Sequence, residues 1–342
     1  MAMDPNSGHV PDQSQPDSPE IQGALAPCTL IVLGAGGYLG REITRHFHGR
    51  RGFRVVGVFR RRPFTAPCDE IVVRDAFASD LCDLVPDQGR VILLNAAFSF
   101  GKVGQGKLGE KYPFLEAAVL AVMKTPSGIC INISSMSAFP DCSSAYGEEK
   151  LFVEKLFSRH RGINIRPGLV VSWERPGAAF QRLLDIVGKH RVVPALTAAG
   201  DGFFICDLDL LILGIEKIVG MSLKKSHTIS FCYARRIRLV DLLRMIGSRL
   251  TRRPILVPVP WRMAYWMVLM KERIAGTTKI RADSILDFAF PATFAPHRQF
   301  YARLACDFRA RQRGHSPADS GQAEFSSLEP ARRGAVKAQR LD

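Results

Sequence analysis

The feature that most constrains the fold of this chain is a glycine-rich run near its N-terminus, Leu33-Gly34-Ala35-Gly36-Gly37-Tyr38-Leu39-Gly40. The run follows the apolar segment Thr29–Leu33, typical of a buried β-strand, and leads into the helix-like segment Leu39–His48. Glycines at this spacing permit a tight turn, let the backbone approach a phosphate, and let the helix pack closely on a sheet. The helix N-terminus adds free N–H groups and the positive end of its dipole. A phosphate-binding turn is therefore predicted, with a simple strand-to-helix turn as the alternative. The expected contacts are Gly34, Gly36, Gly37, Tyr38, Leu39 and Gly40.

Strand-like and helix-like segments alternate over the first half of the chain. The strand candidates are Phe53–Phe59, Glu70–Val73, Val91–Leu94, Gly128–Ile133 and Gly162–Ile165, and the helix candidates are Tyr112–Met123 and Tyr146–Arg159. Such alternation is typical of parallel strands joined by helices that cover the sheet. After Pro167 the pattern loosens. The sequence predicts an α/β fold, a Rossmann-type doubly wound parallel sheet with a smaller C-terminal substrate lobe.

The length of 342 residues exceeds the size at which a single core usually stops growing. Residues 1–27 are rich in Pro, Ser, Asp, Gln and Gly, and residues 310–342 in Arg, Gly, Ser and Ala. Neither segment has a periodic apolar pattern, so both are predicted to be disordered. We expect a dinucleotide-binding domain over residues 28–175. Residues 176–309 are expected to form a substrate lobe, and some of their helices or strands are expected to belong to the dinucleotide-binding domain.

Composition excludes several classes of protein. Hydrophobic residues make up 46% of the chain and charged residues 23%, as in ordinary globular proteins. The eight cysteines include no Cys-x-x-Cys pair, so we expect neither a disulfide framework nor a metal site, and a reducing compartment fits. The N-terminal segment is not typical of a signal or transit peptide. No apolar run reaches the roughly 18 residues of a membrane-spanning helix. We expect a cytoplasmic protein without a transmembrane segment.

The formal net charge of +15 predicts an anionic partner. A basic surface can hold nucleic acid, anionic lipid or phosphorylated small molecules. No recognised RNA- or DNA-binding motif accompanies the charge, so nucleic acid is not expected. The expected partner is a small-molecule substrate, and an anionic one suits the charge.

The second strand candidate ends in an arginine run, Phe59-Arg60-Arg61-Arg62. Chains that bind NAD after such a glycine turn usually carry an acid at this point, which holds the ribose hydroxyls. An arginine instead pairs with a 2′-phosphate, which an acid would repel. Arg60 therefore favours NADP(H) over NAD(H) as the cofactor. NAD(H), and a solvated basic strand end without a ligand, stay open as alternatives.

Three residues further along the chain have the chemistry of proton transfer. Ser135 follows a strand candidate, and Tyr146 and Lys150 are four residues apart in a helix candidate, so these two share one helix face. A phenol ionises at about pH 10, and a nearby ammonium favours the phenolate. Tyr146 can then exchange a proton with a substrate hydroxyl or carbonyl, while Ser135 donates a hydrogen bond to the same oxygen. Lys150 can also hold a nicotinamide ribose.

In this order the motifs resemble the extended short-chain dehydrogenase/reductase superfamily, the NAD-dependent epimerase/dehydratase group, over roughly residues 29–305. Val72-Val73-Arg74-Asp75 resembles the third-strand end whose Asp reaches the adenine. Asn95-Ala96-Ala97 resembles the turn beneath the cofactor, and Ile165-Arg166-Pro167-Gly168-Leu169-Val170 the stretch that borders the nicotinamide. The resemblance implies catalytic roles for Ser135, Tyr146 and Lys150, and a homodimer. It also implies cofactor contacts by Asp75, Ala96, Ala97, Tyr146, Lys150 and Pro167.

Departures from the family narrow the activity. Met136-Ser137 stands where sugar dehydratases carry Asp-Glu, which argues against a 4,6-dehydratase. Gly168-Leu169-Val170-Val171-Ser172-Trp173 replaces the Asn-x-Tyr-Gly-Pro of many nucleotide-sugar epimerases and is closer to reductase-like members. We expect an NAD(P)-dependent oxidoreductase or epimerase that acts on a carbinol or carbonyl carbon, with a nucleotide sugar among the candidate substrates. The alternative is a non-catalytic NADP(H)-binding regulator or assembly factor with the same fold.

Three further features carry expectations about burial. The aromatic and apolar run Trp261–Met270 predicts core of the C-terminal lobe, although an exposed version would suit a membrane or an apolar substrate. Arg235-Arg236-Ile237-Arg238 predicts a solvated basic edge, with a grip on a substrate diphosphate as the alternative. Glu148 and Glu149 are expected to be charges on a helix surface.

Overall fold

The computed structural model describes residues 28–98, 112–197, 202–221, 225–233, 235–275 and 282–290. The two segments that the sequence predicts to be disordered, residues 1–27 and 310–342, lie outside these ranges.

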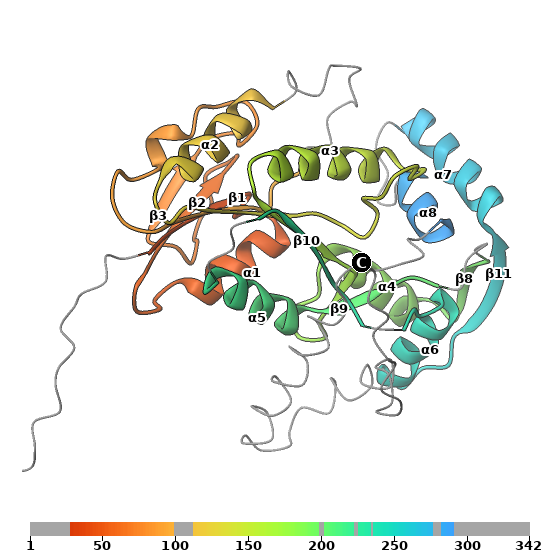
Figure 1. Cartoon of the computed structure of the whole chain (residues 1–342). Coiled ribbons are helices and arrows are strands. Elements are labelled where there is room, and N and C mark those ends of the chain that lie inside the picture. The colour runs from red at the N-terminus through yellow and green to blue at the C-terminus, as the bar shows by residue number, and fades with distance from the viewer. Residues whose placement is uncertain are drawn as a thin grey trace, which may run out of the picture.

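A parallel β-sheet forms the centre of the described structure (Figure 1). Its seven strands are β1 (Cys28–Leu33), β2 (Phe53–Phe59), β3 (Glu70–Val73), β4 (Val91–Asn95), β5 (Ile129–Ile133), β6 (Ile163–Pro167) and β10 (His227–Phe231). They are ordered β10-β6-β5-β4-β1-β2-β3. Every residue of β1 and of β4 is buried, because the strands of a parallel sheet are covered on both faces. The order reverses between β1 and β4, which is the switch point where ligands bind in open α/β sheets.

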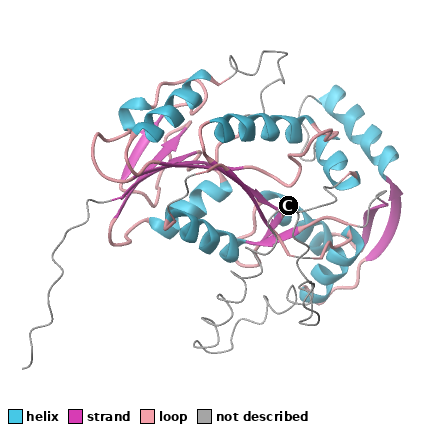
Figure 2. Cartoon of the chain, viewed as in Figure 1, coloured by secondary structure: helices cyan, strands magenta, loops and turns pink. Residues whose placement is uncertain are grey.

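Helices cover both faces of this sheet, as Figure 2 shows in cyan against magenta. In Figure 1, α2 (Pro113–Lys124) and α3 (Ala145–Arg159) lie on one face, and α1 (Tyr38–Phe47) and α5 (Leu208–Val219) on the other. A short 3₁₀ helix (Cys82–Leu84) precedes β4. The predicted Rossmann-type doubly wound sheet is confirmed.

The C-terminal half contributes a second group of elements beside the sheet (Figure 1). Two small parallel pairs are formed, β7 (Leu169–Val171) with β9 (Ile205–Asp207), and β8 (Val192–Thr197) with β11 (Ile255–Pro260). The helices of this half, besides α5, are α4 (Ala178–Lys189), α6 (Leu239–Arg249), α7 (Trp261–Ala275) and α8 (Ala282–Ala289).

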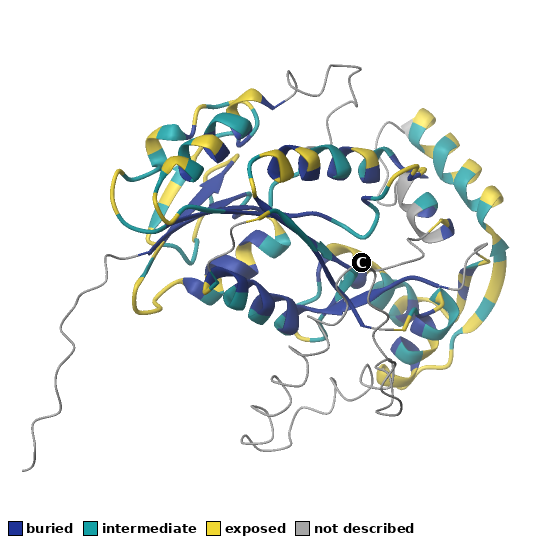
Figure 3. Ribbon diagram, viewed as in Figure 1, coloured by how far each residue is buried: buried dark blue, intermediate teal, exposed yellow. Residues whose placement is uncertain are grey.

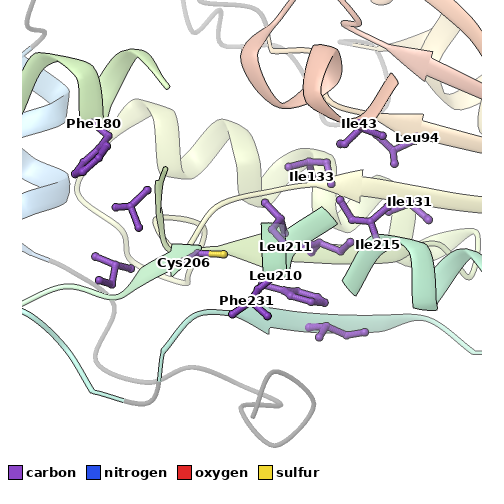
Figure 4. Close-up of a cluster of buried hydrophobic side chains, with 14 of the residues drawn as sticks. Ile43, Leu94, Ile131, Ile133, Phe180, Cys206, Leu210, Leu211, Ile215 and Phe231 are labelled. Atoms are coloured by element: carbon purple, nitrogen blue, oxygen red, sulfur yellow. The ribbon is translucent and has the colours of Figure 1, made fainter. Parts of the chain in front are cut away.

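One hydrophobic cluster runs from the central sheet into the C-terminal half (Figure 4). Ile43 of α1 and Ile131 of β5 belong to it together with Leu211 of α5 and Phe231 of β10. The C-terminal half therefore supplies a strand to the sheet and a helix to its cover. The partition of the chain at residue 175 stays a prediction.

The expectation that Trp261–Met270 is lobe core is wrong for one side of α7. Met263, Trp266, Met267 and Met270 are all exposed. Their helix lies against β8, β11 and α8. Its partly buried apolar positions include Tyr265, Val268 and Leu269. Within the described residues, no helix is long and apolar enough to cross a membrane.

The arginine run before α6 behaves largely as a solvated edge. Arg238 is exposed and its guanidinium donates to the Asp241 carboxylate at 2.7 and 3.1 Å. Ile237 is buried, and its backbone pairs with that of Phe203. Arg238 is therefore paired within its own helical turn, and a grip on a substrate diphosphate stays a prediction.

Candidate functional site

The glycine-rich turn after β1 is built by backbone contacts that leave no room for side chains. Gly34 has φ +77°, and a Cβ there would lie 2.6 Å from the Cα of Ala97. A Cβ on Gly40 would lie 2.2 Å from the carbonyl oxygen of Gly34. The Gly34 and Ala35 N–H groups both donate to the Val58 carbonyl, each at 3.1 Å, and these bonds hold the turn against β2. These glycines are thus required by close backbone approach.

The other two glycines of the turn face solvent at the start of α1. Gly36 and Gly37 are both exposed, and Gly37 is the N-cap of α1 without a side-chain cap. In contrast, Ser144 caps α3 and Asp207 caps α5. An accessible helix N-terminus without a capping side chain offers N–H groups and positive dipole charge to an anion. The turn therefore has the geometry of a phosphate site.

The end of β4 closes over this turn. The Ala96 N–H donates to the Leu33 carbonyl at 2.9 Å. The next residues of the two segments, Gly34 and Ala97, then lie in close backbone contact. The side chain of Asn95 accepts the Ala97 N–H at 3.2 Å and so holds the turn in place. The predicted residues Gly34, Ala96 and Ala97 are therefore adjacent at the switch point of the sheet.

Tyr146 and Lys150 lie together at the same edge of the sheet. The Lys150 Nζ donates to the Ile133 carbonyl at 2.8 Å, at the end of β5. It also lies 5.9 Å from the centroid of the Tyr146 ring and 5.1 Å from that of Phe98. The Phe98 and Tyr146 rings meet edge to face, with centroids 4.8 Å apart. Because Phe98 follows Ala97, direct contacts connect the glycine turn to the tyrosine and lysine.

Local structure at the start of α3 places Tyr146 beside the loop that carries Ser135. The Ser144 hydroxyl accepts the Gly147 N–H at 3.0 Å and starts the helix. A Cβ on Gly147 would lie 2.3 Å from the Ser137 carbonyl oxygen, so only glycine allows this approach. The first turn of α3 therefore packs directly on the loop after β5.

Ser135 is partly exposed in that loop, and its hydroxyl oxygen accepts the Ser137 N–H at 3.1 Å. This leaves its O–H free to donate to a substrate oxygen. The neighbouring Ser134 is buried, and its hydroxyl has no hydrogen-bond partner within the described ranges. Pro167 is buried at the end of β6, where its carbonyl accepts the Met136 N–H at 3.2 Å.

Three asparagines form a buried ladder across adjacent strands behind this edge. Asn95 of β4 donates to Asn132 of β5, and Asn132 to Asn164 of β6, each at 3.0 Å. Asn164 then donates to the Glu154 carbonyl at 3.1 Å and to Ser158 at 2.9 Å. A satisfied polar network of this kind specifies one register. It therefore fixes the strand ends that carry Ala97 and Ser135 relative to α3.

The surroundings of Lys150 are unusually closed for an ammonium group. The residue is 6% exposed, and burial lowers the pKa of Lys150 to about 8, although Glu154 and Glu149 raise it. Glu154 is held by Arg166 through two hydrogen bonds of 2.7 and 2.6 Å. Glu149 is buried and accepts the Tyr112 hydroxyl, so the expectation of a surface charge is wrong for Glu149, whereas Glu148 is exposed.

Replacing Lys150 by Met is expected to change how stability depends on pH. The folded-state pKa lies below the unfolded one, so the wild type gains stability as pH rises from about 8 to about 10.4. Between pH 7 and pH 10 the free energy of unfolding of wild type should rise by about 2 kcal/mol relative to Lys150→Met. Urea denaturation at both pH values measures this difference. If wild type and Lys150→Met differ in free energy of unfolding by the same amount at pH 7 and at pH 10, the lowered pKa of Lys150 is contradicted.

The remaining predicted contacts lie in different settings. Arg60, Arg61 and Arg62 are exposed beyond β2, and none of them has an ion-pair partner within the part of the chain that the structure describes. Asp75 uses its carboxylate to accept the Phe77 N–H at 2.9 Å. The Tyr38 hydroxyl donates to the Arg175 carbonyl at 2.7 Å, so its side chain is turned toward the C-terminal half.

Sequence reasoning missed Phe98 and the asparagine ladder. Nothing in the sequence distinguishes Phe98 beyond its place after Asn95-Ala96-Ala97. The ladder has a signal, because Asn132 and Asn164 each interrupt an aliphatic strand at a fully buried position. A buried amide needs partners, so such positions on neighbouring strands indicate a network. Among the described residues, no group of His, Cys, Asp and Glu is arranged to hold a metal ion.

No family model matches the chain, and no curated protein is similar to it. Solved structures do share its fold. UDP-glucuronic acid 4-epimerase from Bacillus cereus, in complex with UDP-glucuronic acid and NAD, is 16% identical with a TM-score of 0.54, covering 84% of this chain and 100% of its own. UDP-N-acetylglucosamine 4-epimerase from Bacillus cereus is 18% identical with a TM-score of 0.51, covering 68% of this chain and 85% of its own. ADP-L-glycero-D-manno-heptose-6-epimerase from Helicobacter pylori is 16% identical with a TM-score of 0.53, covering 70% and 87%. The chain therefore has the fold that its resemblance to the extended short-chain dehydrogenase/reductases predicted.

Proposed function

We propose that this protein is an NAD(P)-dependent enzyme that oxidises or reduces a carbinol or carbonyl carbon, with net redox or an internal epimerisation. One observation carries the proposal. The phosphate-type turn at Gly34 and the proton-transfer residues Tyr146 and Lys150 lie at one edge of the sheet, joined through Ala97 and Phe98. A simple structural turn would not need a tyrosine and a buried lysine beside it.

The residues at this edge fit a nicotinamide dinucleotide. Gly36 and Gly37 expose the uncapped start of α1, which suits a pyrophosphate. Ala96 and Ala97 have small side chains next to the turn. Lys150 has two N–H donors left after its bond to Ile133, enough to hold a ribose. When bound, the cofactor supplies the hydride acceptor or donor.

The chain's own residues supply the proton chemistry. In the oxidising direction the substrate C–H bond breaks with transfer of a hydride, and the O–H proton passes to the Tyr146 phenolate as the C=O bond forms. Ser135 donates a hydrogen bond to that oxygen. The Lys150 ammonium, 5.9 Å from the Tyr146 ring, stabilises the phenolate. In the reducing direction Tyr146 returns the proton to the oxygen.

The substrate that we propose is an anionic small molecule, with a nucleotide sugar as the first candidate. The fold is shared with proteins named as nucleotide-sugar epimerases, and the net charge of +15 suits a phosphorylated substrate. The sequence has no Cys-x-x-Cys pair among its eight cysteines, which supports the cytoplasm as the proposed compartment. A homodimer and a substrate lobe over residues 176–309 belong to the same proposal.

NADP(H) is the proposed cofactor, and Arg60 is the residue that tests it. Arg60→Ala should weaken NADPH binding by about tenfold or more while NADH binding stays nearly unchanged, because a charge-assisted hydrogen bond to a phosphate is worth about 1.5–3 kcal/mol. Fluorescence titration with each nucleotide measures the effect, and Arg62→Ala is the matched control. Equal losses for both nucleotides would count against Arg60 as the 2′-phosphate partner.

The decisive test of the proposed reaction identifies the nucleotide that the purified protein carries. Denaturation followed by chromatography shows whether the protein holds NAD tightly, and titration of the emptied protein shows which nucleotide it prefers. An empty protein that prefers NADPH would indicate a reductase that exchanges its cofactor with solution. Retained NAD would instead indicate an epimerase cycle, in which the cofactor is reoxidised in place. A protein that binds nucleotide but converts no alcohol, ketone or nucleotide sugar would support the regulator alternative.

A further inference from the structure

Several positions of helix α7 are exposed, and they are coloured yellow in Figure 3. An apolar stripe among them consists of Met263, Trp266, Met267, Met270 and Ile274, which are 50%, 58%, 65%, 49% and 82% exposed. At 3.6 residues per turn, these positions fall within an arc of about 100° on one side of the helix. A contiguous apolar patch of this kind on a soluble surface marks an interaction site.

The opposite side of α7 is anchored, so the stripe is not the result of an unpacked helix. Trp261 meets Phe290 edge to face, with centroids 4.9 Å apart. Tyr265, Val268 and Leu269 are partly buried, and the helix lies against β8, β11 and α8. The stripe is therefore held outward by the fold.

Basic side chains border the stripe on both sides. Arg262 and Arg273 lie about 80–100° from its centre on one side, and Lys271 about 80° on the other. All three are exposed, as are Arg252 and Arg253 just before β11. The single acid between residues 251 and 275 is Glu272, which is on the packed side and accepts the Ala282 N–H at 3.3 Å. Within residues 251–275 the charged side chains that border the stripe are thus basic.

An apolar stripe with basic borders favours some binding partners over others. A second copy of the chain would bring two basic borders together, which is unfavourable. A helix of 15 residues is about 22 Å long, short of the roughly 30 Å hydrocarbon layer, so it cannot span a membrane but can lie along one. Tryptophan and long flexible apolar side chains between basic ones are typical of helices that lie in a lipid interface.

We propose that the outward face of α7 binds peripherally to an anionic lipid bilayer. The apolar stripe enters the boundary between headgroups and acyl chains, and Arg262, Lys271 and Arg273 contact the anionic headgroups. None of the stripe residues is among the residues that we propose for the nucleotide site.

Vesicle sedimentation of the full chain tests the proposal. The protein should sediment with phosphatidylcholine vesicles that contain phosphatidylglycerol and remain in solution with pure phosphatidylcholine. Lys271→Glu with Arg273→Glu should weaken binding by about tenfold or more, because each basic residue near an anionic surface contributes several-fold. Trp266→Glu should weaken it similarly. Trp266→Phe should still sediment but lose the blue shift of tryptophan fluorescence that vesicles cause in wild type.

Matched variants at other exposed positions test whether the loss of vesicle binding is specific to the outward face of α7. Phe64→Glu makes the same aromatic-to-acid change at a fully exposed loop position, and Lys155→Glu reverses an exposed charge on α3. Both should bind vesicles as wild type does, and circular dichroism should show all variants folded. The proposal would be overturned if the wild-type protein does not sediment with anionic vesicles, or if Trp266→Glu sediments with them as wild type does. A dimer dissociated by Trp266→Glu, without vesicle binding, would assign the face to a second copy instead.

Discussion

Tyr146→Phe is expected to lower kcat by about 10²–10⁴-fold while the affinity for NADPH stays nearly unchanged. The substitution removes only the phenol oxygen, which we propose gives and takes the substrate proton. The ring itself stays in place, because its edge-to-face contact with Phe98 and its approach to Lys150 do not involve the hydroxyl. Steady-state kinetics and nucleotide titration of the same preparation measure the two effects.

Tyr265→Phe is the matched control for this experiment. It removes a phenol hydroxyl from α7, outside the proposed site, and should leave kcat at the wild-type value. Full activity of Tyr146→Phe would remove Tyr146 from the mechanism. A parallel loss of nucleotide affinity would mean that the hydroxyl holds the cofactor and not the substrate proton.

Gly34→Ala is expected to destabilise the protein by about 3 kcal/mol or more and to abolish dinucleotide binding. Two effects add at this position. The positive φ of +77° costs an L-residue about 1 kcal/mol, and the new Cβ would lie 2.6 and 2.7 Å from the Cα and N of Ala97. These contacts are with backbone, so the ends of β1 and β4 must separate, and the phosphate turn is lost with them.

Gly49→Ala isolates the first effect, the cost of the positive φ. Gly49 has nearly the same φ, +74°, but a Cβ there would meet nothing within 4 Å. This variant should lose only about 1 kcal/mol and should bind NADPH normally. Urea denaturation and nucleotide titration of the pair measure the difference. Equal stability and equal binding of the two variants would show that the close approach to Ala97 is not required.

Much of the central sheet could be predicted because its elements are bounded by strong local signals. β2 and β3 have the residues that the apolar runs indicate, Phe53–Phe59 and Glu70–Val73. Helix α3 begins at Ala145, one residue before the expected Tyr146, because Ser144 caps it. The spacing of Tyr146 and Lys150 likewise determines that both side chains lie on one face of that helix.

The C-terminal half could not be predicted in the same way, because its strands depend on distant partners. β11 contains Pro258 and ends in Pro260, residues that argue against a strand, yet it pairs in parallel with β8. The apolar run of α7 has hydrophobic residues on both sides, so its composition does not reveal which side the fold leaves exposed. The contact of Phe98 with Lys150 depends on the β4 loop, for which no local pattern exists.

Titration of the nucleotide-free protein with NADPH and NADH tests the central claim most directly. We predict saturable binding of one NADPH per chain, tighter than that of NADH, with loss of binding in Gly34→Ala and retention in Tyr146→Phe. Absence of binding for both nucleotides to folded wild-type protein would contradict the account, since the edge formed by Gly34, Ala97 and Lys150 would then serve another purpose.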